Sequence, residues 1–274
     1  IYDHPETVAE SRGARRMPAG LWFVRAAHAV VAAITARGID GPLYEVDMRL
    51  RPSGNKGPVA VSLSSFERYH AEDAWTWERM ALTRARVIAG PAHLVRRIEA
   101  TIHDTLRSAG DPRTIRDDVR DMRQRLARDM PPKGAWDVKY RVGGSMEVEF
   151  VAQTLQLIAA RDHPEVLDVS TGSALAKLTE AGLLDRADSE LLIGAGLLWR
   201  TMQGMLRVLV GRSVPEDIAP STAQPLLHAV GALGIDVADI AGLRRHIDEV
   251  GTSVRAVFER VVGPLSGRTG GDAR

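Results

Sequence analysis

The chain contains no cysteine, and this absence excludes several kinds of site at once. Disulfides, thiolate metal sites and cysteine nucleophiles are all ruled out. Aromatic residues are scarce at 5%, and lysine occurs only at positions 56, 133, 139 and 177. The eight histidines show no His-x-x-x-His spacing, so a zinc site is not expected either.

No charge of one sign dominates, because 36 basic residues face 35 acidic ones. A net charge of +1 excludes a polycation that holds nucleic acid by charge alone, so no nucleic-acid partner is expected. No apolar run approaches the roughly 20 residues that a membrane helix needs, and no signal peptide opens the chain. We therefore expect no membrane contact and a cytoplasmic location. Because the chain begins Ile1-Tyr2-Asp3 without Met, we expect a piece of a longer protein.

What is present is typical of a folded protein of two domains. The 274 residues are 45% hydrophobic and 26% charged. Strand-like and turn-rich material is confined to residues 40–90, and the remainder has helical periodicity. We expect a mixed α/β head over residues 1–90, a helical bundle over residues 91–265 and a disordered tail over residues 266–274.

Helical patterns cover most of the chain. Pro18 suits the first turn of a helix that would end near Gly38, and Leu21, Val24, Ala27, Val31 and Ile34 repeat at helical spacing. Ser64 or Ser65 could cap a further helix, and packing of the following helix on a sheet would explain Trp75 and Trp77. Further patterns span residues 91–108, 113–129, 145–161, 173–182, 187–211, 221–233 and 236–263.

Residues 43–51 predict the clearest strand and the first candidate site. Strict alternation puts Tyr44, Val46, Met48 and Leu50 on one face, and Glu45, Asp47, Arg49 and Arg51 on the other. Residues 52–58 would form a turn, and residues 59–63 a return strand. The charged face is either a solvated sheet surface or a metal and phosphate site, in which carboxylates hold Mg²⁺ and arginines hold phosphate oxygens.

The second candidate site is the segment from Asp137 to Phe150, in which Gly143 and Gly144 precede a helix. Amide groups at such a helix start can receive an anion. Ser145 and Glu147 fit an ordinary helix cap, whereas Glu149 is less easily explained in so apolar a helix. Lys56, Lys133 and Lys139 flank the two candidate sites.

These stretches resemble the C-terminal, adenylylating half of the bifunctional glutamine synthetase adenylyltransferase/adenylyl-removing enzymes. The matching motifs are Tyr44 to Gly54, Ala74-Trp75-Thr76-Trp77-Glu78 with Ala81 to Arg86, and Gly143-Gly144 with Glu147-Val148-Glu149-Phe150 and Gln153. Glu147 stands where the family usually has Asp, so Glu147 is discounted and Glu149 is kept. The resemblance spans essentially all of residues 1–262.

The resemblance implies a truncated nucleotidyltransferase head of the DNA polymerase beta-like kind, followed by a helical bundle. Such enzymes transfer AMP from ATP to a tyrosine hydroxyl of glutamine synthetase with Mg²⁺, and remove it by phosphorolysis through their other half. The resemblance implies that Asp47 is the catalytic metal ligand, that Arg49 and Arg51 contact phosphate, and that Lys139 and Glu149 support the nucleotide cleft. The PII signal protein is the implied regulatory partner.

The family's paired-acid motif, Gly-Ser-Asp-x-Asp, is absent from these 274 residues and would lie just before Ile1. We therefore expect this chain to be inactive alone. Two alternatives are kept: a transferase that modifies the PII protein with UTP, against which residues 75–78 argue, and a non-catalytic helical interaction module over residues 91–263.

Overall fold

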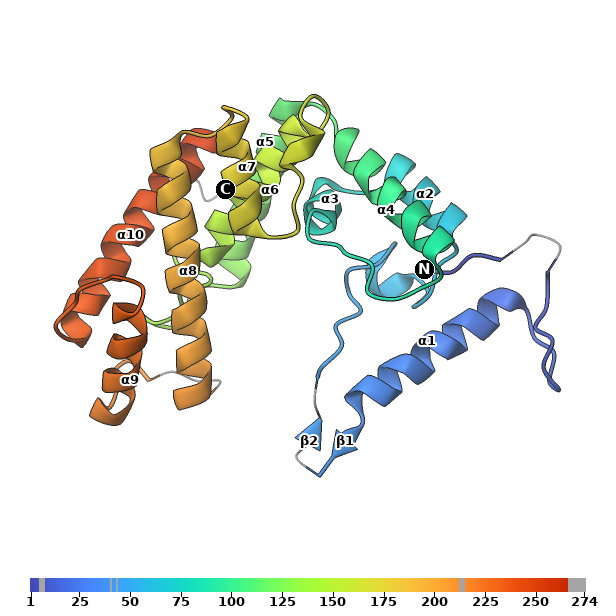
Figure 1. The fold of residues 1–274 in the computed structure, drawn as a ribbon, viewed down its shortest axis with the longest axis horizontal. Coiled ribbons are helices and arrows are strands. Elements are labelled where there is room, and N and C mark those ends of the chain that lie inside the picture. The colour runs from blue at the N-terminus through green and yellow to red at the C-terminus, as the bar shows by residue number, and fades with distance from the viewer. Residues whose placement is uncertain (5–7, 40, 43, 212–214, 266–274) are drawn as a thin grey trace, which may run out of the picture. The chain divides into compact units, whose positions relative to one another are not determined.

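The computed structural model describes residues 1–4, 8–39, 41–42, 44–211 and 215–265, and they are mostly helical (Figure 1). The chain divides into two compact units, Ile1–Thr105 (unit 1) and Leu106–Arg274 (unit 2). The expected tail at 266–274 lies outside the described residues. Among the helices described, none is both long and apolar enough to cross a bilayer.

Unit 1 holds the helices α1 (Ala19–Thr35), α2 (Leu63–Glu72) and α3 (Thr76–Leu82), a short 3₁₀ turn at Gly54–Lys56, and most of α4 (Ala92–Arg107). The expected helix after Pro18 is confirmed. The cap of α2 is Ser62, whose hydroxyl accepts from the Ser65 amide at 3.2 Å, and not Ser64 or Ser65. Ser62 satisfies one of the amides that a helix start leaves free.

The strand expected at 43–51 is wrong for the described residues 44–51, which form neither helix nor strand. Leu43 lies outside the described residues. The expected return strand is also absent, since Leu63 already begins α2. A strand forms only where a neighbour pairs with its backbone. The described part of unit 1 offers only a two-residue ladder, β1 (Arg37–Gly38) with β2 (Gly41–Pro42), and isolated bridges.

The chain start adopts an extended conformation. The Tyr2 amide donates to the Val61 carbonyl at 3.0 Å, and the Leu63 amide donates to the Tyr2 carbonyl at 2.8 Å. This makes a parallel bridge between Tyr2 and Ser62. The Tyr2 ring also stacks on Phe23 of α1, with centroids 4.2 Å apart. These contacts tie the first residues to α1 and α2.

The described residues of unit 2 form a bundle of six helices, with one short 3₁₀ turn at Pro164–Val166. The helices are α5 (Pro112–Asp129), α6 (Ser145–Ala159), α7 (Thr171–Glu180), α8 (Arg186–Leu209), α9 (Pro220–Gly231) and α10 (Ile240–Val261). All six expected helical patterns are confirmed to within a few residues. Local signals set the starts: Asp111 accepts from the amides of Arg113 and Thr114 at 3.0 Å each, with Pro112 in the first turn.

The core of unit 2 lies around α6, which packs against α5, α7, α8 and α10 (Figure 1). Nearly every residue of α6 from Val151 to Ala159 is buried, because its apolar residues are not confined to one stripe. Trp199 of α8 and Phe258 of α10 are the largest side chains with no exposed area. This core holds the loop before α6 in place.

Candidate functional site

The segment around Asp47 is an exposed loop of unit 1 in which the expected acid and arginine pair with each other. Arg49 donates from Nε to Oδ1 of Asp47 at 3.0 Å and from Nη2 to Oδ2 at 2.6 Å, and its amide donates to Oδ1 at 3.0 Å. The two side chains are 57% and 76% exposed. These hydrogen bonds from Arg49 lower the pKa of Asp47 to about 2, so the carboxylate is ionised at any neutral pH.

Arg51 is engaged differently, since it folds back on the backbone of its own loop. Its Nε donates to the Gly57 carbonyl at 3.3 Å, and its Nη1 contacts the Met48 carbonyl. The apolar positions of the expected strand are not covered, because Tyr44 is 65% and Leu50 68% exposed. No group of three or more His, Asp or Glu side chains that could hold a metal occurs among the described residues.

The tryptophans of the second motif do not pack as the sequence suggests. Trp75 is 68% and Trp77 40% exposed. The buried residue of the motif is Glu78, whose carboxylate accepts from the Trp75 amide at 3.0 Å and the Tyr69 hydroxyl at 2.8 Å. Glu78 thus caps the first turn of α3, and its hydrogen bond with Tyr69 links α3 to α2.

The Gly-Gly turn before α6 is a packing device and not the anion site considered from the sequence. The amides of Gly143, Gly144 and Ser145 donate to Glu147, the Arg141 carbonyl and the Val138 carbonyl. A side chain at Gly143, whose φ is +65°, would begin 1.8 Å from the carbonyl oxygen of Gly251 in α10. Only glycine at position 143 permits this close approach of the turn to α10. The amides of the turn already donate to acceptors within the protein, so none is left to bind an anion.

Glu147, discounted from the sequence, is the residue that organises this turn. It is fully buried, and its Oε1 accepts from Arg123 of α5 at 2.8 Å and from Arg255 of α10 at 2.5 Å. Its Oε2 accepts from the Gly143 amide at 3.0 Å. One carboxylate therefore links three helices and the turn. The sequence carries no local signal for it, because its partners lie 24 and 108 residues away.

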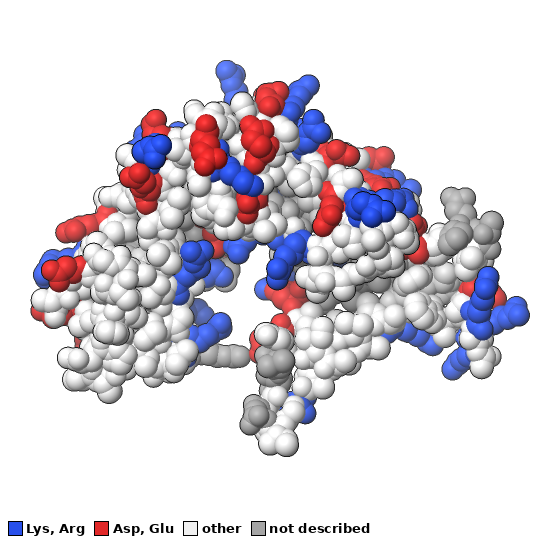
Figure 2. Space-filling view, viewed as in Figure 1, with Lys and Arg blue, Asp and Glu red and all other residues white. Residues whose placement is uncertain are grey.

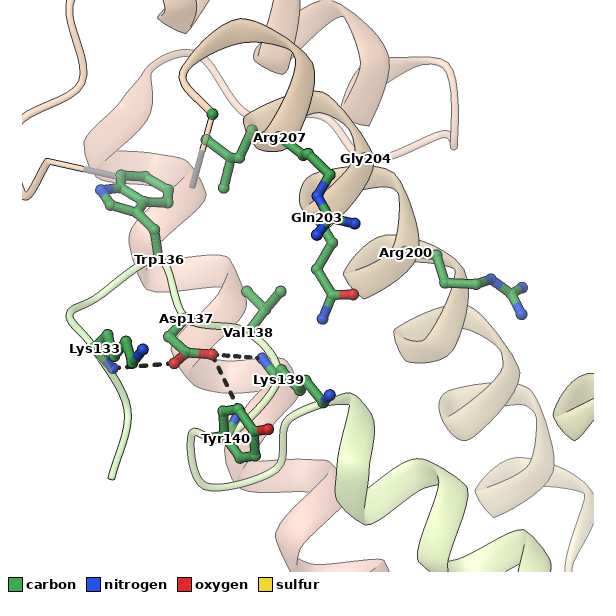
Figure 3. Close-up of a pocket in the computed structure, with 12 residues that line it drawn as sticks. Lys133, Trp136, Asp137, Val138, Lys139, Tyr140, Arg200, Gln203, Gly204 and Arg207 are labelled. Carbon is green, nitrogen blue, oxygen red and sulfur yellow. Dashed lines mark hydrogen bonds between the residues drawn. The ribbon is translucent and has the colours of Figure 1, made fainter. Parts of the chain in front are cut away.

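A cavity of about 600 Å³ lies beside this turn within unit 2. The loop 133–140 forms one wall, and the face of α8 from Arg200 to Arg207, with Gly211 just beyond the end of the helix, forms the other (Figure 3). Lys139 is among the lining residues. Glu149 is not, and lies half-buried on α6. Sequence reasoning missed Arg200, Gln203 and Arg207, although their spacing of three and four residues places them on one helical face.

Comparison with known families gives two matches that divide the chain. Residues 1–101 match the model described as glutamate-ammonia ligase adenylyltransferase, and residues 113–262, more than half of the chain, match the one described as GlnD PII-uridylyltransferase. The helical part belongs to the latter domain family.

Relatives that align with both parts of the chain show which of these two family names applies to the chain as a whole. Proteins of Rhodopseudomonas palustris strain TIE-1, Bradyrhizobium diazoefficiens and Xanthobacter autotrophicus are 40%, 39% and 38% identical over 96%, 96% and 92% of this chain. Each is named a bifunctional glutamine synthetase adenylyltransferase/adenylyl-removing enzyme. This chain belongs to that adenylyltransferase family. It spans about a quarter of the length of these relatives, 26%, 26% and 25% respectively.

Proposed function

We propose that this chain is the part of an adenylyltransferase that takes part in transfer of AMP from ATP to a tyrosine hydroxyl of glutamine synthetase. The supporting observation is the 40% identity over 263 residues to a relative of that name, which runs through both units. In this proposal residues 1–105 belong to a nucleotidyltransferase head, and residues 106–262 form the helical bundle that follows it.

Asp47 is proposed as the residue that holds Mg²⁺. Its carboxylate is exposed and ionised, and magnesium is commonly bound by one or two carboxylates together with substrate phosphates. When bound, the ion supplies neutralisation of the charge that develops on phosphate oxygens. Arg49 is proposed to leave Asp47 and contact phosphate, and Arg51 to orient that loop. Lys139 and Glu149 are proposed to support the nucleotide from unit 2.

The 274 residues alone are proposed not to catalyse AMP transfer. The chain lacks a Gly-Ser-Asp-x-Asp sequence, and no group of three or more His, Asp or Glu side chains that could hold a metal occurs among the described residues. An ion held by a single carboxylate keeps most of its waters and binds weakly. Activity therefore needs acidic residues supplied from outside this sequence.

The test is the substitution Asp47→Asn in a full-length enzyme that contains this sequence, with incorporation of labelled AMP into glutamine synthetase as the readout. We expect a loss of at least about tenfold, since removing a charge beside the metal reduces stabilisation of the transition state. Glu72→Gln, which removes an exposed carboxylate on α2, is the control and should retain activity. Activity of Asp47→Asn within twofold of the unsubstituted enzyme would contradict the role of Asp47.

A second candidate, transfer of UMP to the PII signal protein, is favoured by the family match of residues 113–262. The match over residues 1–101 and the relatives that cover both units favour ATP. Competition between ATP and UTP in the full-length enzyme separates the two, and we expect UTP to compete poorly. Glutamine synthetase and the PII protein are the proposed macromolecular partners, with unit 2 as a possible binding module.

A further inference from the structure

The cavity between the loop 133–140 and α8 is unusual in its charge. Among the described residues, its lining contains four cationic side chains, namely Lys133, Lys139, Arg200 and Arg207, and a single carboxylate, that of Asp137. None of the four cations forms an ion pair with a carboxylate among the described residues. Figure 2 shows basic side chains along the edge of α8. Cations gathered in one hollow repel each other unless an anion joins them.

The single acid of the cavity is already committed to the backbone. Asp137 accepts from the Lys133 amide at 3.0 Å through Oδ2, and from the amides of Lys139 and Tyr140 at 3.1 and 3.2 Å through Oδ1 (Figure 3). These three bonds fold the loop so that both lysines border the same hollow. The carboxylate thus shapes the loop, and its one negative charge offsets only one of the four positive charges of the lining.

Buried side chains and a hydrogen bond hold both walls in place. Val138 and Leu206 are buried beneath the cavity, and Trp136 is anchored by its indole N–H, which donates to the Glu216 carbonyl at 2.9 Å. Gln203 of α8 contacts the Ser145 hydroxyl at the start of α6, at 3.4 Å. Arg200 is directed away from the loop (Figure 3). Lys139 and Arg207, one from each wall, are therefore the two cations best placed to act together.

We propose that this cavity binds the linked phosphates of a small anion, as found in a nucleoside triphosphate or in inorganic tripolyphosphate. Lysine acts on such a group as a point charge, whereas the planar guanidinium of arginine can bind two phosphate oxygens at once. Several cations spread over one hollow match an anion that carries several charges along a chain. The proposal rests on the proposed function only for its choice of a nucleotide as one source, because every lining residue belongs to unit 2.

The test is calorimetric titration of the 274-residue chain with tripolyphosphate, ATP and orthophosphate without added metal. We expect tripolyphosphate and ATP to compete for one site and to bind at least tenfold more tightly than orthophosphate. Lys139→Gln and Arg207→Gln should each weaken binding about tenfold, and Lys139→Arg should restore most of it. Arg186→Gln, an exposed cation on α8 outside the cavity, should change binding less than twofold.

Two results would overturn the proposal: equal affinity for tripolyphosphate and orthophosphate, or unchanged affinity in both Lys139→Gln and Arg207→Gln. All the substituted side chains are exposed, so circular dichroism should show an unchanged fold. The outcome is separable from that of the proposed function. If tripolyphosphate binding depends on Lys139 while Asp47→Asn keeps full activity, the cavity proposal stands and the proposed role of Asp47 fails. If Asp47→Asn loses activity while Lys139→Gln and Arg207→Gln bind tripolyphosphate with unchanged affinity, only the cavity proposal fails.

Discussion

The two units of this chain differ in how completely they bury their apolar side chains. Among the described residues, six buried apolar side chains belong to unit 1 and 32 to unit 2. The helix α1 of unit 1 is strongly apolar, yet Ala19 is its only buried residue. The helix α8 of unit 2 has seven buried residues along 24 positions. A helix derives most of its stability in a protein from tertiary packing. An apolar helical sequence therefore stabilises α8, which is packed, much more than α1, which is exposed.

The difference shows that an apolar sequence pattern gives a stable helix or strand only where other parts of the same unit pack against its apolar face. In unit 2, α6 is covered by four neighbouring helices. In unit 1, Leu21, Trp22 and Val30 of α1 are 44%, 46% and 58% exposed. These side chains therefore lack the cover that the helices of unit 2 give one another. The alternating residues 44–50 have the same character, since they carry a strand pattern without a partner strand among the described residues.

The largest effect is expected from the buried ion pairs of Glu147 in unit 2. Glu147→Ala would leave the guanidinium groups of Arg123 and Arg255 without their carboxylate. Removing one partner of a buried ion pair costs about 3 to 5 kcal/mol of unfolding free energy. Urea unfolding of the chain measures it, with the exposed Glu190→Ala on α8 as the control. A loss below about 1 kcal/mol would refute the central role of Glu147.

A pair of tryptophan substitutions compares the two units directly. Trp199 is fully buried in unit 2, whereas Trp22 of α1 is 46% exposed. Truncation of a buried Trp to Ala costs about 3 to 5 kcal/mol, because it leaves a cavity, and Trp22→Ala should cost less than about 1 kcal/mol. Thermal and urea unfolding of both variants give the difference. Equal losses would mean that α1 is as well packed as α8.

The smallest expected effect is a pH dependence confined to unit 1. Burial, with a smaller contribution from the Arg79 guanidinium, lowers the pKa of His70 to about 4. His70 is 5% exposed, and its Nδ1 has no hydrogen-bond partner among the described residues. The unfolded chain takes up a proton near the ordinary pKa of about 6.5, so unfolding free energy should fall as the pH drops from 6.5 towards 4, by up to about 3 kcal/mol.

The imidazole titration of His70, followed by NMR, gives this pKa in the folded chain. His70→Leu should remove the dependence in that pH range. A His70 pKa above 6 would contradict the burial of its ring.

Prediction from the sequence succeeded where the determining contacts are local. The six helices of unit 2 follow from their apolar spacing, and the structure shows that their caps at Asp111 and Ser170 are local as well, with partners within three residues. Prediction failed where distant residues decide. The strand at 43–51 needed a neighbouring strand, and Glu147 needed two arginines from other helices.

The candidate sites divide in the same way. Asp47 and Arg49 could be named from the sequence, but their bidentate pairing in an exposed loop could not, because the alternating pattern placed them on a sheet. The Gly143-Gly144 turn could be located but was misinterpreted, since the approach of Gly251 is visible only in the fold. Only part of the basic cavity could be predicted from the sequence: Lys133 and Lys139 were named, whereas the residues of α8 opposite them were not.

Hydrogen–deuterium exchange of the 274-residue chain, resolved by peptide, is the most direct test of the contrast between the units. Buried, well-packed helices open only by large-scale unfolding, whereas exposed helices open locally at low cost. We predict that the amides of α6, α8 and α10 exchange at least about a hundredfold more slowly than those of α1, which corresponds to a difference of about 3 kcal/mol in opening free energy. Protection of α1 equal to that of α6 would contradict the account.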